Sequence, residues 1–111
     1  MDIVVTREET LSVFALRGRL DAVSAPELEE RLNAWFNEPA ANLVFDLSGL
    51  DYISSAGLRV FLTAAKKIKS RNGKLGMSQL KPNVQEVFTI SGFIALIPAF
   101  ESLEAALEAV R

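Results

Sequence analysis

The sequence contains neither cysteine nor histidine. Thiolates and imidazoles serve as nucleophiles, general bases and zinc ligands, so these two absences exclude cysteine catalysis, serine–histidine catalysis and Cys/His zinc sites. The sequence also lacks a Gly-x-x-x-x-Gly-Lys-Ser/Thr loop, a Gly-x-Gly-x-x-Gly loop and a recognisable pair of catalytic carboxylates. We therefore expect a protein that is not an enzyme and that holds no cofactor and no metal.

Long hydrophobic runs are also missing, although 50% of the residues are hydrophobic. No run approaches the roughly 20 apolar residues that cross a bilayer. The N-terminus carries Asp2 before the strand-like segment 3–5, where a secretory signal has basic residues before a hydrophobic stretch. We expect the protein in the cytoplasm.

The charge balance is slightly acidic, with a formal net charge of −2. A nucleic-acid-binding domain needs a basic stripe or patch, so another protein is the more natural partner. The length of 111 residues suits one domain, residues 1–111, whose core is large enough to form without disulfides.

Short apolar runs alternate with amphipathic segments along the chain. Strands are expected at residues 3–6, 11–16, 43–47, 74–78 and 94–97, and a turn at 48–51. Helices are expected from the Ser24 capping box to residue 36, from about Ser55 to residues 72–73, from Pro82 to Gly92, and from Ser102 onward. An N-terminal hairpin followed by alternating strands and helices predicts an α/β fold, with a mixed, mostly parallel sheet of about five strands and about four helices.

Two adjacent serines, Ser54 and Ser55, lie where a predicted strand gives way to a predicted helix. A serine before a helix is most simply an N-cap, whose loss costs about 1 kcal/mol. One cap needs only one hydroxyl, so the second serine is free to face solvent. The N–H groups and dipole of a helix start also favour negative charge, which a phosphoserine supplies. The pattern therefore fits either a plain helix cap or a phosphoacceptor.

Three stretches resemble the STAS domains of bacterial anti-sigma factor antagonists, and the resemblance covers essentially the whole chain. They are residues 18–21 (Gly-Arg-Leu-Asp), 45–48 (Phe-Asp-Leu-Ser) and 52–58 (Tyr-Ile-Ser-Ser-Ala-Gly-Leu). The third is the most specific and is similar to the phosphoacceptor loop of that family. The resemblance implies a single STAS-like domain with a regulatory, protein-binding role.

In that family a serine kinase of the histidine-kinase-like ATPase fold phosphorylates the serine two residues before the loop glycine. The resemblance therefore implies Ser55 as the phosphoacceptor. The residues that it places around this serine are Asp21, Ser54, Ala56 and Gly57. Many members have Asp where this chain has Ser54, and a neutral serine can only form hydrogen bonds. Asp21 is then the nearer group to orient the hydroxyl or to take its proton.

These implications predict a charge switch. The unmodified protein binds an anti-sigma factor or serine kinase and frees the target of that partner. Phosphorylation of Ser55 adds about 1.5 to 2 negative charges and releases the partner. A PP2C-type phosphatase reverses the modification, while ATP and Mg²⁺ belong to the kinase. Contacts with the partner are expected from Asp51, Leu58 and Arg59, of which Arg59 lies one helical turn after Ser55.

The second predicted helix carries a group of basic residues in an otherwise acidic chain. They are Arg59, Lys66, Lys67, Lys69 and Arg71. Such a group suits either an ordinary solvated face or a contact with an acidic partner. The apolar segment 93–100 favours a core strand over a partner groove, and Trp35 falls on the apolar stripe of the first helix, which favours a core position.

A different role is also consistent with the resemblance, because STAS domains serve as structural parts of membrane transport machinery, including lipid-transport ABC systems. Such a scaffold needs no phospho-switch. The acceptor sequence Ser55-Ala56-Gly57 favours the switch, whereas Ser54 in place of Asp is compatible with the scaffold role. A small-molecule sensor is less expected, since no convergent set of polar groups is evident.

Overall fold

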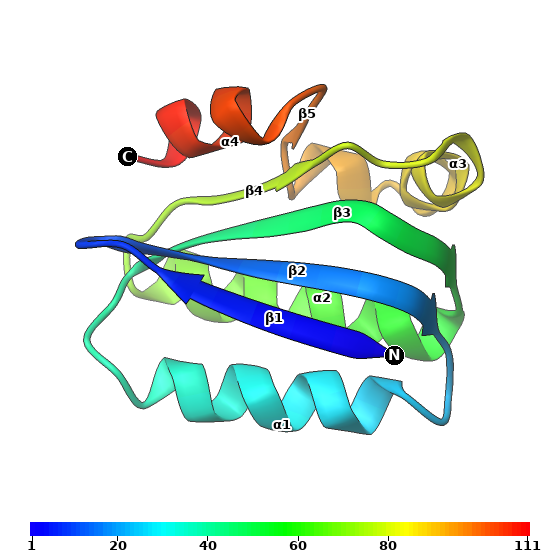
Figure 1. The fold of residues 1–111 in the computed structure, drawn as a ribbon, viewed down its shortest axis with the longest axis horizontal. Coiled ribbons are helices and arrows are strands. Elements are labelled where there is room, and N and C mark those ends of the chain that lie inside the picture. Colours follow the sequence, from blue (N-terminus) through cyan, green and yellow to red (C-terminus); the bar gives the residue numbers. More distant parts are fainter.

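A computed structural model describes all residues, 1–111, and places five strands in one sheet in the order β1-β2-β3-β4-β5. The strands are β1 (Asp2–Arg7), β2 (Leu11–Leu20), β3 (Asn42–Ile53), β4 (Leu75–Ser78) and β5 (Ala99–Phe100). β1 is antiparallel to β2, and every later pair is parallel (Figure 1). This arrangement confirms the predicted α/β fold with an N-terminal hairpin and a mostly parallel sheet.

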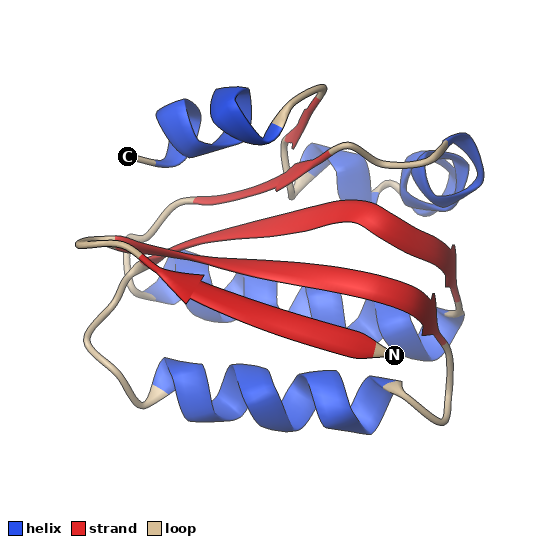
Figure 2. Ribbon diagram, in the orientation of Figure 1, coloured by secondary structure: helices blue, strands red, loops and turns tan.

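Four α-helices and one 3₁₀ turn connect and cover the strands. They are α1 (Ala25–Phe36), α2 (Ser55–Ser70), α3 (Pro82–Ser91), the 3₁₀ helix η1 (Phe93–Ala95) and α4 (Leu103–Val110). α1 and α2 lie on one face of the sheet. α4, the last helix of the chain, lies near β4 and β5 (Figure 2). Even α2, with 16 residues, is too short and too polar to cross a membrane.

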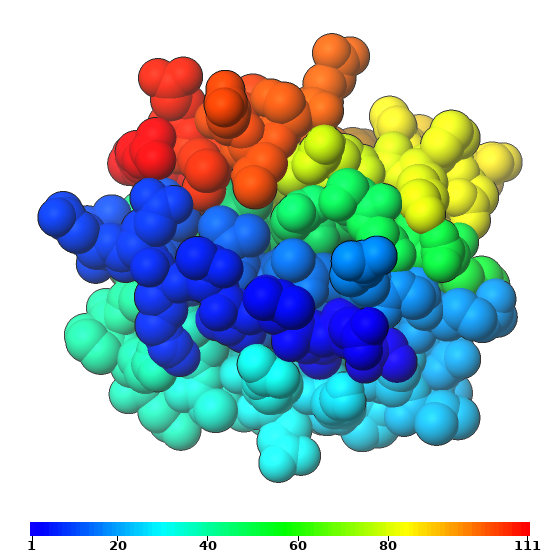
Figure 3. All heavy atoms as spheres, in the orientation of Figure 1, coloured from blue at the N-terminus to red at the C-terminus, as the bar shows by residue number.

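The sheet buries apolar side chains on both faces. Along β2, Phe14 and Leu16 join the main core beneath α1 and α2, whereas Leu11 and Val13 join a second cluster with α4. This alternation follows from the two-residue period of a strand. Trp35 is 1% exposed within the main core, which confirms its predicted place. On the surface, β1 (blue) lies between α1 (cyan) and α4 (red and orange) (Figure 3).

β3 is much longer than the predicted strand 43–47, and the turn predicted at 48–51 is wrong. The pairing of β2 with β3 shifts register twice, and at each shift β3 carries one residue more than β2. Such bulges bend a strand without ending it. The bulges also explain why residues 48–51 resembled a turn. In this part of β3 the buried residues Leu47, Leu50 and Ile53 recur at every third position, whereas a regular strand buries every second residue. The bulged half of β3 leads directly to Ser54.

The strand predicted at residues 94–97 is also wrong. Gly92, with φ of 81°, ends α3 and turns the chain into η1, where the N–H groups of Leu96 and Ile97 both donate to the carbonyl of Phe93 at 2.9 and 3.1 Å. The 3₁₀ turn thus provides acceptors for backbone N–H groups that a strand would have paired with a neighbouring strand. The short strand β5 begins only after Pro98. Ile97 is buried, but Leu96 is 53% exposed.

The ends of the helices follow the predicted signals in part. Ser102 caps α4, since its Oγ accepts a hydrogen bond from the N–H of Ala105 at 3.1 Å. Gly92 ends α3 as expected. The capping box at Ser24 does not form, because the Ser24 hydroxyl donates to the carbonyl of Arg19 at 2.8 Å and is used in the turn before α1. After α2 the left-handed residue is Asn72, with φ of 58°.

Candidate functional site

The C-terminal ends of β2 and β3 meet the start of α2 at one edge of the sheet. The carbonyl of Leu20 accepts a hydrogen bond from the N–H of Ser54 at 2.9 Å. Ser54 has an extended backbone and its Oγ accepts a hydrogen bond from the N–H of Gly57 at 3.2 Å, so it is the N-cap of α2. Ser55 is the first helical residue and is exposed. The two hydroxyls are therefore divided as expected, with Ser54 as the cap and Ser55 facing solvent.

Gly57 allows the first turn of α2 to lie directly on the ends of β2 and β3. A Cβ atom at this position would lie 2.7 Å from Cγ of Leu20 and 3.0 Å from Cγ1 of Ile53, closer than ordinary van der Waals contact. Ala56, the preceding residue, is half-buried and packs against the main core. The small residues after Ser55 thus set how closely the start of α2 approaches the ends of β2 and β3, and with it the position of the Ser55 hydroxyl.

Replacement of Gly57 by alanine tests this close approach. In an ordinary helical position Gly→Ala stabilises by about 1 kcal/mol. Here we expect the overpacking of Leu20 and Ile53 to outweigh that gain and to destabilise the protein by about 1 to 2 kcal/mol. Urea unfolding followed by circular dichroism measures the difference. An unfolding free energy equal to or above that of the wild type would show that the helix start can move aside without cost.

Asp21 lies in the turn after β2, next to the site, and its carboxylate is engaged within that turn. Oδ1 accepts hydrogen bonds from the N–H groups of Val23 and Ser24 at 3.0 and 3.1 Å. These bonds, that of Ser24 foremost, lower the pKa of Asp21 below its usual range. Since every hydrogen bond of this side chain is local, its clearest structural role is to order the turn that borders the helix start. The expected part of Asp21 in moving the Ser55 proton stays a prediction.

Asp51 is exposed on β3 and tied to the start of α3. Its carboxylate forms an ion pair with Lys81, and its carbonyl accepts a hydrogen bond from Nδ2 of Asn83 at 2.8 Å. The bond with Lys81 lowers the pKa of Asp51. The negative charge of Asp51 is thus matched within the chain by Lys81. The contact of Asp51 with a partner stays a prediction.

Two further side chains at this edge were not singled out from the sequence. The guanidinium of Arg19 lies 4.1 Å from the ring centre of Tyr52, a cation–π geometry between paired residues of β2 and β3. Both side chains are exposed, and Val23 in the neighbouring turn is 89% exposed. The sequence offered only one sign of this pair: Arg19 and Tyr52 fall within residues 18–21 and 52–58, two of the stretches that resemble STAS domains. Their pairing depends on the β2–β3 register.

The candidate partner residues of α2 differ in how much surface they offer. Leu58 is half-buried and packs against the main core, whereas Arg59 is exposed and takes part in no ion pair within the chain. Both Ser55 and Arg59 are exposed one helical turn apart, which is the spacing at which a guanidinium can reach a phosphate.

The other basic residues of α2 do not form one face. Lys67 donates to Oδ1 of Asn33 at 3.1 Å and lies over the ring of Phe36. Arg71 binds the carbonyl of Phe36 and also lies over that ring, so both side chains tie α2 to the end of α1. Lys66 and Lys69 make no such contacts. The predicted basic face is therefore divided between a helix contact and a free surface.

No group of three or more acidic side chains in the structure is placed to hold a metal ion. At the helix start itself, the N–H groups of Ser55 and Ala56 have no acceptor within α2, as in the first turn of any helix. The arrangement thus offers an exposed hydroxyl beside free N–H groups, where an added anion is electrostatically favoured.

Comparisons with known proteins agree with this geometry. A family model described as the STAS domain matches residues 2–106. BtrV of Bordetella bronchiseptica, which is named as an anti-sigma factor antagonist, is 40% identical over 111 residues, covering 100% of this chain and 96% of BtrV. The crystal structure of an anti-sigma factor antagonist from Mycobacterium paratuberculosis is 28% identical with a TM-score of 0.90, covering 99% of this chain and 93% of that one.

The Bacillus protein SpoIIAA has the same fold and has been solved in two states. Its phosphorylated form superposes with a TM-score of 0.78 at 18% identity, covering 99% of this chain and 100% of that one. The unphosphorylated form of the anti-sigma factor antagonist SpoIIAA gives 0.86 at 19%, covering 99% and 96%. At these identities the likeness concerns the fold alone. The match over residues 2–106 and the identity with BtrV show that this chain belongs to the STAS domain family, with anti-sigma factor antagonists among its relatives.

Proposed function

We propose that this chain is a protein-binding switch controlled by phosphorylation of Ser55. One observation carries the proposal: Ser54 supplies the N-cap of α2, which leaves the Ser55 hydroxyl exposed and outside the capping bond. A chain that needed only a helix cap has no use for the second hydroxyl. The unmodified surface around Ser55 binds an anti-sigma factor, and the modified surface does not.

The helix start accommodates the added phosphate within the domain. The N–H groups of the first turn and the helix dipole stabilise a negative charge there, and Arg59 lies one turn away. The net charge of −2 falls to about −4 on addition of a phosphate that carries about two negative charges. An interface that fits a neutral hydroxyl must then desolvate a dianion, which costs several kcal/mol. The modification therefore alters binding without disturbing the fold.

The partner we propose is an anti-sigma factor that is also a serine kinase of the histidine-kinase-like ATPase fold. Its binding to this chain frees whatever the kinase had sequestered. A PP2C-type phosphatase regenerates the unmodified form. The whole chain, residues 1–111, acts as one domain in the cytoplasm and is a substrate of these enzymes without catalytic activity of its own.

The comparisons support this assignment over a structural role in membrane transport. BtrV is named as an anti-sigma factor antagonist and matches over 96% of its length. A scaffold subunit gains nothing from an exposed serine at a helix start, whereas a switch depends on it.

Phosphorylation in an extract of the source cell tests the proposal. The purified chain is incubated with extract, ATP and Mg²⁺, and its phosphopeptides are mapped by mass spectrometry. We expect one phosphate per chain, on Ser55, and none on the Ser55→Ala variant. The Ser54→Ala variant is the matched control, since it keeps the acceptor and loses only the cap.

Two outcomes of this experiment contradict the proposal. Phosphate on Ser54 in place of Ser55 would show that the proposal names the wrong hydroxyl as the acceptor. Equal labelling of the wild type and of Ser55→Ala would show that extract kinases act elsewhere on the chain and that Ser55 is not the acceptor.

A further inference from the structure

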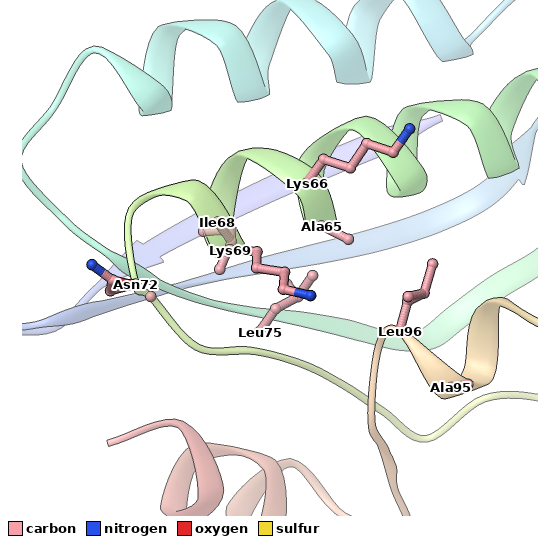
Figure 4. A pocket seen from close by; sticks show the side chains of 9 residues that line it. Ala65, Lys66, Ile68, Lys69, Asn72, Leu75, Ala95 and Leu96 are labelled. Atoms are coloured by element: carbon pink, nitrogen blue, oxygen red, sulfur yellow. The ribbon is translucent and has the colours of Figure 1, made fainter.

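A groove of about 640 Å³ lies beside the C-terminal half of α2, away from the Ser55 end of that helix. Its walls are α2 with the turn after it on one side and the segment from Ala95 to Leu96 on the other, with Leu75 of β4 between them. Figure 4 shows Leu96 projecting toward α2 and the side chain of Lys69 lying over Leu75. The apolar floor thus lies beneath a basic side chain.

Lys66 and Lys69 are the charged residues of the groove, and neither has a partner. The three ion pairs of the chain involve Arg7, Lys81 and Arg111 as their cations. Lys66 and Lys69 also make no side-chain hydrogen bond, in contrast to Lys67 between them, which binds Asn33. Figure 4 shows the Lys69 ammonium group beside Leu75, whereas the side chain of Lys66 extends along α2, away from Leu75 and Leu96. An acidic protein therefore keeps one unmatched positive charge over the apolar residues of the groove and a second on the adjoining surface of α2.

Leu96 gives the same groove an unpartnered apolar wall. It is 53% exposed, and its position is fixed because its N–H donates to the carbonyl of Phe93 at 2.9 Å at the end of η1. The segment that was expected to be a buried strand thus presents a large apolar side chain to solvent. Apolar surface next to free charge of one sign is the composition expected of a docking site for an amphipathic chain of opposite sign.

We propose that this groove docks an acidic amphipathic segment of a second partner protein. A carboxylate of that segment pairs with Lys69, an apolar side chain beside it packs against Leu75 and Leu96, and a second carboxylate meets Lys66 on the adjoining surface of α2. A linear segment suits the site, because the groove has walls on two sides only and follows α2 for more than one turn. Charge complementarity selects an acidic occupant.

The groove and Ser55 are separate sites on one helix. Lys66 lies eleven residues after Ser55, a distance of about 16 Å along α2 at the usual helical rise. A partner in the groove can therefore stay bound whether or not Ser55 is modified. The proposal does not depend on the switch at Ser55, and either one can fail while the other holds.

The test uses a fluorescent synthetic helix of fourteen residues as the probe, with glutamates and leucines on opposite faces, and a second peptide with glutamine for every glutamate. We expect fluorescence anisotropy to show saturable binding of the acidic peptide and at least tenfold weaker binding of the glutamine peptide. Backbone amide shifts in a ¹⁵N-labelled sample should change in the second half of α2 and in η1, and not around Ser55.

Variants of the chain assign the binding to the groove. We expect Lys69→Glu to weaken binding at least tenfold and Leu96→Ala about threefold or more. Arg31→Glu is the matched control, since it makes the same charge change on an exposed residue of α1 and should alter affinity less than twofold. The Ser55→Asp variant should bind the probe as the wild type does.

Several results would overturn the proposal. Equal weakening by Arg31→Glu and Lys69→Glu would mean general attraction between opposite charges. Equal binding of both peptides, or shift changes outside the groove, would remove the charged groove as the site. Sedimentation that shows self-association of the chain, lost in Lys69→Glu, would make a second copy the occupant in place of a partner protein.

Discussion

Replacement of Ser55 by aspartate is expected to weaken the complex with the anti-sigma partner at least about a hundredfold, which corresponds to about 2.7 kcal/mol. The carboxylate places a negative charge where the partner meets a neutral hydroxyl, so the interface must desolvate it or leave a gap. The partner is first recovered from extract on the immobilised wild-type chain in the presence of ADP. Isothermal titration with the purified partner then gives the dissociation constants.

The same substitution should leave the fold intact. An acidic residue in the first turn of a helix stabilises it by about 0.3 to 1 kcal/mol, so the unfolding free energy of Ser55→Asp should equal or exceed that of the wild type. A loss of affinity together with a loss of stability would instead point to damage at the helix start, and the effect on binding could not then be assigned to charge.

Two serine-to-alanine variants complete the comparison. Ser55→Ala should bind the partner as tightly as the wild type does, because it stays neutral. Ser54→Ala should lose about 1 kcal/mol of stability with its cap, yet also keep its affinity. If Ser55→Asp bound as tightly as Ser55→Ala, charge at this position would not control the complex, and the switch would be wrong.

The sequence was most informative where local chemistry decides the structure. The second hydroxyl at Ser54 and Ser55 predicted a division of roles because one helix start uses one capping oxygen, and the structure has that division. The hairpin, the parallel crossovers and the caps at Gly92 and Ser102 follow from the same kind of short-range signal. The α/β fold could therefore be predicted.

The sequence was least informative where pairing between distant segments decides the structure. The bulges of β3 depend on its register against β2, so residues 48–51 resembled a turn while they were part of a strand. The cation–π pair of Arg19 with Tyr52 depends on the same register. The contact of Lys67 and Arg71 with the end of α1 depends on how two helices pack. None of these can be deduced from spacing along one helix or one strand.

Removal of the Phe61 ring is expected to cause the largest loss of stability in the chain. Phe61 is fully buried on α2, with its ring centre 4.5 Å from that of Phe45 on β3 and 5.3 Å from that of Phe88 on α3. The ring thus joins a strand and two helices. We expect Phe61→Ala to lower the unfolding free energy by about 3 to 5 kcal/mol, since the cavity cannot close when three elements support its walls.

Urea unfolding and thermal melts measure this loss, with Leu62→Ala as the control. Leu62 is the next residue on α2 but is only half-buried, so its truncation should cost about 1 kcal/mol. Equal losses for both variants would mean that the core closes around the missing ring and that Phe61 does not hold the three elements together. Phe61 lies on the buried face of the helix whose exposed start carries Ser55, so its loss should lower stability while leaving the affinity of the remaining folded protein close to that of the wild type. Ser55→Asp should lower the affinity and leave the stability unchanged or higher. The two variants together therefore separate the structural role of α2 from its role in partner binding.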